Sequence, residues 1–231
     1  MDRSDTHGSV EPQGSRAGRT PIGEEVYDVL LSRILSAEMK PEGRITIDAI
    51  ARELGVSQTP IREALHRLDA EGVVVRTHLA GYRVAPMMTR ELFEDLVELR
   101  LLLEPAATRR AAERASDSDL SELRVLADAM RPEVLAESGS RGYALFSQRD
   151  AEFHDRIALC GRNTFIRDSL SRLHTHVHLF RLSNKASVTS EAIEEHAEIV
   201  AAIGRRDPDA AAYAMRSHIE ASARRFGAAF E

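Results

Sequence analysis

The chain has 231 residues, of which 43% are hydrophobic and 29% are charged, a balance typical of a globular protein with one large or two ordinary domains. Its net charge of −6 argues against general attraction to a polyanion, although a local basic surface can still bind nucleic acid. The single cysteine excludes an intramolecular disulfide framework and a multi-cysteine zinc site, and no apolar run approaches the roughly 20 residues of a membrane span.

Residues 1–21 contain mostly glycine, serine, arginine and acidic residues and offer almost nothing to bury. We expect a disordered tail there, and no secretory signal, because the segment has no apolar core. Together with the single cysteine, this predicts a cytoplasmic protein.

Residues 22–86 are predicted to form three short helices and a β-hairpin. Apolar stripes with helical spacing run through residues 22–35 and 47–54, and Gly55 ends the second stripe. A third helix is expected between Ser57 and Gly72, with a capping box at its start. The segments VVVR and YRVA then form two strands around a polar turn.

The order helix, short turn, helix, hairpin predicts a winged helix-turn-helix, whose second helix enters the major groove of DNA. On that helix Arg62 is suited to a guanine edge and Gln58 to an adenine edge. The residues expected to contact DNA are Arg44, Ser57, Gln58, Thr59, Arg62, His66, Arg67 and His78, with Arg76 and Arg83 also on the wing. Residues 57–83 contain four arginines against three acidic residues, so we expect a dimer that binds two half-sites.

Residues 87–231 are predicted to be entirely helical, because long amphipathic segments alternate there with brief breakers. About six helices are expected, at 89–115, 118–137, 142–160, 163–183, 190–205 and 207–228. The predicted fold class is therefore mainly α, with an N-terminal winged helix-turn-helix and a C-terminal all-helical bundle.

The segment LGVSQTPIREALHRLDAEGVV, followed by GYRV, resembles the DNA-binding domain of the GntR family of bacterial transcription regulators. The helical domain after it resembles the FCD effector domain of the FadR-type branch, and the two resemblances together cover residues 22 to about 228. They imply a bacterial regulator, usually a repressor and not an enzyme, whose residues 87–231 bind an effector and support dimerisation. The family often has arginine at the position of Gln58, so the operator need not match the commonest family site.

Asp150 and His154 are four residues apart on a predicted helix and therefore lie on one face, where they can bind one ion. His196 and His218 lie on the last two predicted helices, and a bundle can project such side chains into one cavity. The same four positions match the metal-binding FCD pattern, in D-x-x-F-H, EEH and MRSHI. This donor set predicts a divalent transition metal, Zn²⁺ first, with Ni²⁺ or Mn²⁺ as alternatives. For each histidine taken alone, ordinary packing is the alternative.

Arg100 and Glu104 match an Arg–Glu pair of the same family, and a buried arginine can hold a carboxylate through two hydrogen bonds. We expect both residues near the effector, and an intrahelical structural pair is the alternative. His174 and His178 share a predicted helical face and are further effector candidates. With His176 they form a cluster that lines the same cavity, binds a second ion or is exposed.

These observations predict a regulator whose operator affinity is controlled by a small carboxylate bound beside the metal. Two alternatives stay open: a regulator for which the ion itself is the signal, and a metal-dependent hydrolase. Loss of the ion together with release of DNA would favour the first, and ester or amide hydrolysis that disappears in His196→Ala would favour the second.

Overall fold

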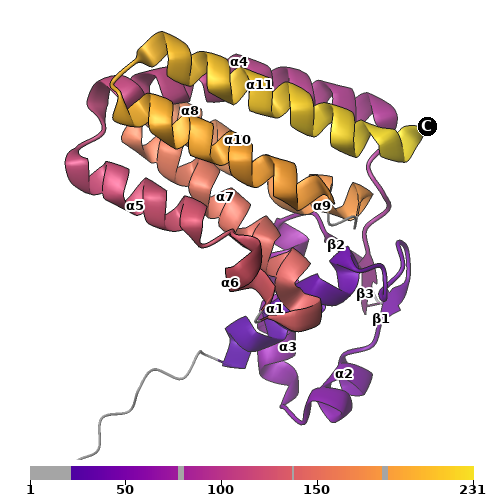
Figure 1. Ribbon diagram of the computed structural model, residues 1–231. Coiled ribbons are helices and arrows are strands. Elements are labelled where there is room, and N and C mark those ends of the chain that lie inside the picture. Colours follow the sequence, from indigo (N-terminus) through magenta and orange to yellow (C-terminus); the bar gives the residue numbers. More distant parts are fainter. Residues whose placement is uncertain (1–21, 78–80, 137, 184–186) are drawn as a thin grey trace, which may run out of the picture.

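The computed structural model describes residues 22–77, 81–136, 138–183 and 187–231, so the tail predicted for residues 1–21 lies outside the described residues. A smaller N-terminal lobe contains three helices and a small sheet, and a larger helical bundle follows it (Figure 1). The helices in chain order are α1 (Ile22–Leu35), α2 (Ile47–Leu54), α3 (Gln58–Ala70), α4 (Arg90–Arg114), α5 (Asp117–Asp128), α6 (Pro132–Ala136), α7 (Gly142–Cys160), α8 (Thr164–Ser171), α9 (Thr175–Leu182), α10 (Ser187–Gly204) and α11 (Pro208–Gly227). The strands are β1 (Arg44–Ile45), β2 (Val74–Thr77) and β3 (Gly81–Val84), and two 3₁₀ turns lie at Gly139–Arg141 and Ala228–Phe230.

In the N-terminal lobe, α1 packs against α3 and both helices bury their apolar stripes. The tight turn between α2 and α3 depends on Gly55, which adopts a left-handed conformation with φ 66° and donates its N–H to the carbonyl of Ala51. The predicted capping box of α3 is absent, because Ser57 occupies the N-cap position without a side-chain cap bond. The buried face of α3 consists of Ile61, Ala64, Leu65 and Leu68, which leaves its opposite face to solvent.

The sheet is antiparallel with the strand order β1-β3-β2, so the predicted hairpin β2–β3 is present as the wing. The sequence did not predict β1, since two residues are too few to show an alternating pattern. This strand pairs Arg44 with Arg83 of β3 and so fixes the wing to the segment between α1 and α2.

In the bundle, the long helix α4 lies along α11, and α10 contacts α11 and α5 (Figure 1). Helix α7 packs against α4 and α5 and also contacts α1 of the N-terminal lobe. Local capping sets the start of several helices: Thr89 caps α4, a Ser116–Asp119 capping box begins α5, and Asn163 caps α8.

Two of the predicted helices are each divided in the structure. The segment 118–137 contains α5 and the short α6, and the segment 163–183 contains α8 and α9. The second division ends at His174, a non-glycine residue with φ 44°. Glycine and proline are the usual breakers, and neither occurs between residues 164 and 183, so this break could not be predicted from a breaker residue.

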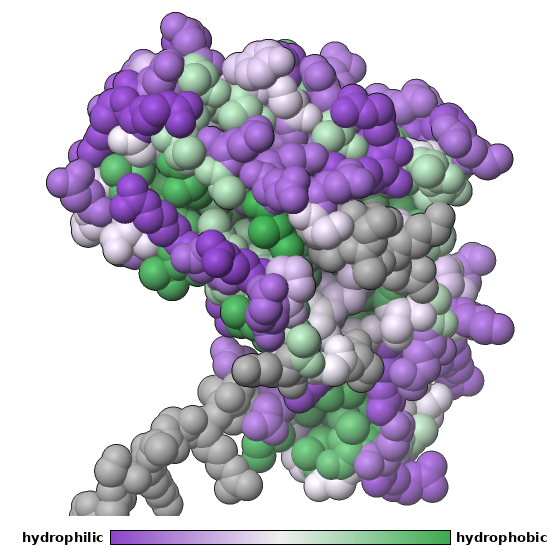
Figure 2. Space-filling view, in the orientation of Figure 1, coloured by the Kyte–Doolittle hydropathy of each residue, from purple (hydrophilic) through white to green (hydrophobic). Residues whose placement is uncertain are grey.

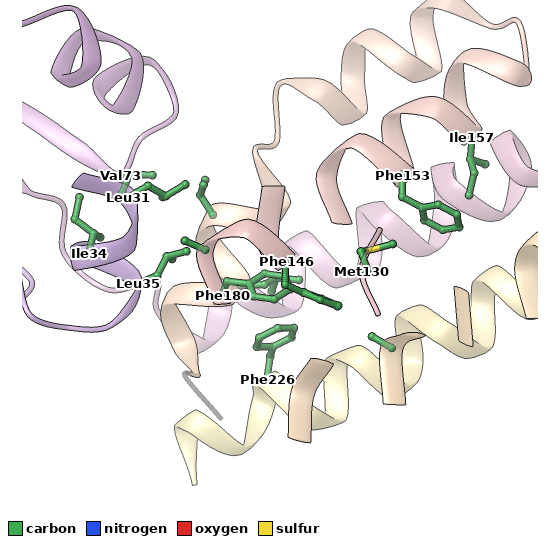
Figure 3. Packing of buried hydrophobic residues seen from close by; sticks show 14 of the residues in the cluster. Leu31, Ile34, Leu35, Val73, Met130, Phe146, Phe153, Ile157, Phe180 and Phe226 are labelled. Carbon is green, nitrogen blue, oxygen red and sulfur yellow. The ribbon is translucent and has the colours of Figure 1, made fainter. Parts of the chain in front are cut away.

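One buried apolar cluster runs through both lobes. Figure 3 shows Leu31, Ile34 and Leu35 of α1 on one side of it and Phe146 and Phe180 of the bundle on the other. Polar and charged residues cover much of the face drawn in Figure 2, with apolar residues in smaller patches. Among the described residues, no helix combines the length and hydropathy that crossing a bilayer requires.

Candidate nucleic-acid interface and metal centre

The exposed face of α3 carries most of the predicted DNA contacts. Thr59, Arg62 and His66 are exposed there, and Ser57 and Gln58 lie exposed at its start. The side chain of Gln58 is already engaged, because its Nε2 donates to Oδ1 of Asp48 at 2.5 Å and its Oε1 accepts from Arg62 at 3.0 Å.

The wing extends this surface. The ring of His66 lies edge-on to Tyr82 of β3, with ring centroids 6.2 Å apart, so α3 and the wing are in direct contact. Arg44, Arg76 and Arg83 are exposed on the three strands. His78, the remaining predicted contact, lies outside the described residues.

Arg67 does not lie with the other predicted DNA contacts. Successive residues of a helix are rotated by about 100°, which turns Arg67 well away from the row formed by Gln58, Arg62 and His66. Its guanidinium lies 3.7 Å from the ring centroid of Tyr27, and its Nε bonds Glu71 at 3.2 Å. The structure therefore places Arg67 against α1, on the side of α3 that faces its own lobe.

Inside the bundle, three imidazoles converge from α7, α10 and α11. His154, His196 and His218 each contribute one ring nitrogen to a group whose members all lie within 4.8 Å of one another. Oδ1 of Asp150 lies 3.4 Å from Nε2 of His196 and 3.9 Å from Nε2 of His154. The structure thus brings together the four residues that the sequence singled out for a metal.

Two carboxylates orient the imidazoles from behind. Glu104 of α4 lies 2.6 Å from Nδ1 of His154, and Glu195 of α10 lies 2.7 Å from Nδ1 of His218. A carboxylate on one ring nitrogen fixes the tautomer and directs the other nitrogen to a ligand position. Glu104 is itself held by Arg100 at 2.5 Å, and Glu195 by two bonds from Arg225.

Burial keeps two of the three rings neutral. Burial and the neighbouring imidazoles lower the pKa of His196 and His218 well below the ordinary value, and neutral imidazole is the form that binds metal. For His154, burial acts to lower the pKa, but Glu104 and Asp150 outweigh it and raise the pKa. Burial also disfavours the charged form of Glu104, yet Arg100 and His154 hold the pKa of that carboxyl well below its usual range.

A cavity of about 180 Å³ adjoins His154. Arg100, Glu104, Asp150 and His154 form one part of its wall. The rest of the wall comes mainly from α7, α8 and α9 and consists of Ala151, Asp155, Leu170, Ser171, His174, Thr175 and His176. The candidate metal ligands Asp150 and His154, a guanidinium and hydroxyl groups therefore line one partly open cavity.

The three histidines around α9 have different surroundings. His174 and His176 line the cavity, and burial with the neighbouring histidines lowers the pKa of His176 to about 3. His178, which the sequence placed beside the effector, is not part of the cavity wall. A Cβ on Gly72, just after α3, would lie 3.4 Å from Cε1 of His178, so this ring lies against the N-terminal lobe. The division of the predicted helix at His174 accounts for this difference.

Comparison with known proteins agrees with both parts of this arrangement. Residues 22–84 match the model of the bacterial regulatory proteins of the gntR family, and residues 95–221 match the FCD domain. The chain belongs to the GntR family and carries an FCD domain. It is a transcriptional regulator, not an enzyme.

Two curated transcriptional regulators match this GntR protein along most of their length. The Nta operon transcriptional regulator of Aminobacter aminovorans is 31% identical, over 80% of this chain and 85% of that protein. The probable D-xylose utilization operon transcriptional repressor of Paenarthrobacter nicotinovorans is 28% identical, over 92% of each. Among solved structures, Escherichia coli McbR/YncC covers 92% of this chain and 100% of its own at 18% identity, and its TM-score of 0.67 shows a shared fold.

Sequence reasoning missed several residues of the FCD site. Glu195 and Arg225 support His218 from two different helices, and Ser171 and Thr175 line the cavity. The only available signal for Glu195 was its place beside His196 in the EEH segment. Its pairing with a histidine 23 residues away depends on how α10 and α11 pack, which no local pattern predicts.

Proposed function

We propose that this regulator represses transcription by binding an operator as a homodimer, and that a small carboxylate beside a metal ion in the FCD domain controls its affinity for DNA. The observation that carries the proposal is the convergence of three imidazoles inside the bundle, one of which, His154, lines a cavity together with Arg100. A DNA-binding unit and a ligand cavity in one chain are the two sites that linkage requires. Repression is proposed because one relative is named a probable repressor.

The residues present fit a metal. Nε2 of His154 and both ring nitrogens of His196 are buried without a hydrogen-bond partner among the described residues, and such groups are costly unless something binds them. Asp150, His154, His196 and His218 would hold the ion. Nitrogen and oxygen donors without thiolate favour Zn²⁺, with Ni²⁺ or Mn²⁺ as alternatives. A bound ion supplies a positive centre for a carboxylate oxygen.

The cavity suggests the size and class of the ligand. A cavity of about 180 Å³ suits a small molecule, and we propose a ligand of roughly four to six carbons. Arg100 lines the cavity on the side of the metal ligands, and Ser171, Thr175 and His176 supply polar groups elsewhere in the wall. A short hydroxy acid or sugar acid matches these groups. The adjoining cavity is also why we favour a bound carboxylate over the ion alone as the signal.

The test begins with the metal content of the purified full-length protein. About one equivalent per chain is expected, with loss in His196→Ala and no loss in the control His66→Ala, which changes a histidine of the DNA surface. Operator affinity is then measured by fluorescence anisotropy with C4–C6 hydroxy acids and sugar acids. A change that requires both metal and acid supports the proposal, a change with metal alone supports the metal-sensing alternative, and no response to either contradicts both.

The proposed homodimer pairs through the outer face of α4 and the neighbouring part of α11. Leu92 and Leu102 of α4 are 56% and 65% exposed, and Tyr213 of α11 is 73% exposed. Leu102 and Tyr213 line one shallow groove between the two helices. Large apolar side chains gathered on one exposed face are typical of a protein interface. A symmetric dimer would also present two copies of α3 to the two half-sites of an operator.

A further inference from the structure

We propose that α9 carries the state of the FCD cavity to the DNA-binding lobe, with His178 and Arg181 as the positioning residues. This inference rests on the proposed function, because it presumes that occupancy of the cavity changes operator affinity. It assigns a role to the histidine cluster that the metal site leaves unexplained.

The beginning of α9 belongs to the cavity. His174, Thr175 and His176 are consecutive residues of its wall. His174 has φ 44°, in the left-handed region that few residues other than glycine adopt, and it stands immediately before the first turn of α9. A ligand that contacts this wall therefore contacts the first turn of α9 directly.

The rest of α9 contacts the N-terminal lobe at a joint formed by Gly72, Val73 and Ala85. The ring of His178 lies over Gly72, as the close approach to a Cβ at that position indicates. Nη2 of Arg181 donates to the carbonyl of Ala85. Ala85 N–H in turn donates to the carbonyl of Val73 at 2.9 Å, which closes the joint.

The joint is attached to both DNA-contacting elements. Gly72 follows the C-terminus of α3, and Ala85 follows the last residue of β3, the inner strand of the wing. Tyr27 braces the same end of α3, because its hydroxyl donates to Glu71 at 2.7 Å. A displacement of α9 thus acts on the residues that follow α3 and β3, and it changes the angle at which α3 and the wing meet DNA.

Packing makes α9 suitable for transmission. Val177, Leu179 and Phe180 are buried, and the ring of Phe180 contacts Phe146 and Phe226. Because α9 is short and closely packed on its buried side, it moves as a rigid body. A shift of its first turn therefore also displaces His178 and Arg181. Figure 3 shows Phe180 between the α1 side of the cluster and Phe226.

A second contact between the lobes offers a competing route. Nε2 of Gln148 on α7 donates to Oδ1 of Asp28 on α1 at 2.7 Å. Gln148 lies two residues before Asp150, so α7 also links the metal site to the DNA-binding lobe. The experiment must separate these two routes.

The experiment compares the full-length wild type with the double variant His178→Ala/Arg181→Met, with Gln148→Ala, and with Arg172→Met as the control. Arg172 is an exposed arginine in the turn before α9. Amide hydrogen exchange is followed with EDTA and with Zn²⁺ as the probe, and operator affinity is measured under the same conditions. In the wild type and the control, Zn²⁺ is expected to slow exchange in the bundle and at residues 68–75 and 84–86.

In the double variant the bundle still responds to Zn²⁺ and metal-free operator affinity stays within about twofold, but the response at residues 68–75 and 84–86 is lost. The proposal is overturned if these responses persist, or if Gln148→Ala removes them instead. If the wild-type bundle does not respond to Zn²⁺, the proposed function fails, and metal-free calorimetry then decides about α9. If α9 couples the two lobes, the wild type shows one unfolding transition and the double variant shows two. The same number of transitions in both proteins overturns the proposal.

Discussion

Glu104 and His154 are joined by a 2.6 Å hydrogen bond inside the bundle, and this bond determines which ring nitrogen of His154 is presented to its neighbours. Because Nδ1 is occupied by the carboxylate, Nε2 is left facing Asp150. Arg100 completes the chain by holding the other oxygen of Glu104. The Arg–Glu pair, which the sequence associated with the effector, therefore also controls the orientation of a candidate metal ligand.

Glu104→Gln is expected to weaken Zn²⁺ binding by about 10- to 100-fold, because a neutral amide orients His154 poorly and lowers its basicity. Competition with a chromophoric chelator measures the affinity. Glu113→Gln, at an exposed position of the same helix, serves as the control. Equal affinities for Glu104→Gln and the wild type would show that the pair has only a structural role.

Arg62→Ala is expected to cost about 1–3 kcal/mol of specific operator binding and to relax the preference at one base pair, if Arg62 pairs with a base edge. Arg67→Ala is expected to leave base preference intact and to destabilise the N-terminal lobe, since Arg67 contacts Tyr27 and Glu71. Binding to a set of operators with single base changes distinguishes the two. A uniform loss across all sequences would assign Arg62 to phosphate contact.

His176→Asn is expected to reduce the decrease in the free energy of unfolding as the pH is lowered. The folded pKa of His176, about 3, lies below the ordinary 6.5, so between these values the unfolded chain binds a proton that the folded chain does not. His176 therefore leaves the free energy of unfolding unchanged above about pH 6.5. As the pH falls from 6.5 towards 3, His176 lowers this free energy by about 1.4 kcal/mol per pH unit. Urea unfolding in EDTA from pH 7.5 to 5 measures this slope. Thr175→Ala, in the same cavity wall, should keep the wild-type slope.

Leu102→Asp is expected to convert the proposed dimer to a monomer and to weaken binding to a two-site operator much more than binding to a half-site. Val125→Asp is a matched control, since Val125 on α5 is 64% exposed and Leu102 is 65% exposed. Sedimentation velocity gives the oligomeric state. A Leu102→Asp protein that sediments like the wild type would place the dimer contact elsewhere.

The predictions from sequence were strongest where one periodic pattern decides the structure. The apolar positions of α3 recur at helical spacing and are all buried, and Gly55 forms the left-handed turn before it. The four proposed metal ligands converge because each lies on an inward face of a long amphipathic helix. In these places local pattern and tertiary packing favour the same structure.

The features that the sequence did not predict are those that depend on packing between distant segments. The break before α9 has His174 in a left-handed conformation, and no glycine or proline marks it in the sequence. The contact of the exposed Arg67 side chain with Tyr27, 40 positions earlier, was also not predicted, since no local pattern links the two residues. Glu195 was missed for the same reason, since its partner His218 lies on another helix.

The carboxylate of Asp48 competes with DNA for the side-chain amide of Gln58. In the free protein this carboxylate holds the amide of Gln58 at 2.5 Å. Random DNA brings phosphates, which repel Asp48 and offer the amide no base edge in return. If Gln58 pairs with an adenine edge, as its residue type predicts, adenine at that position would replace Asp48 as its partner. Discrimination would then come partly from the unfavourable binding of other sites.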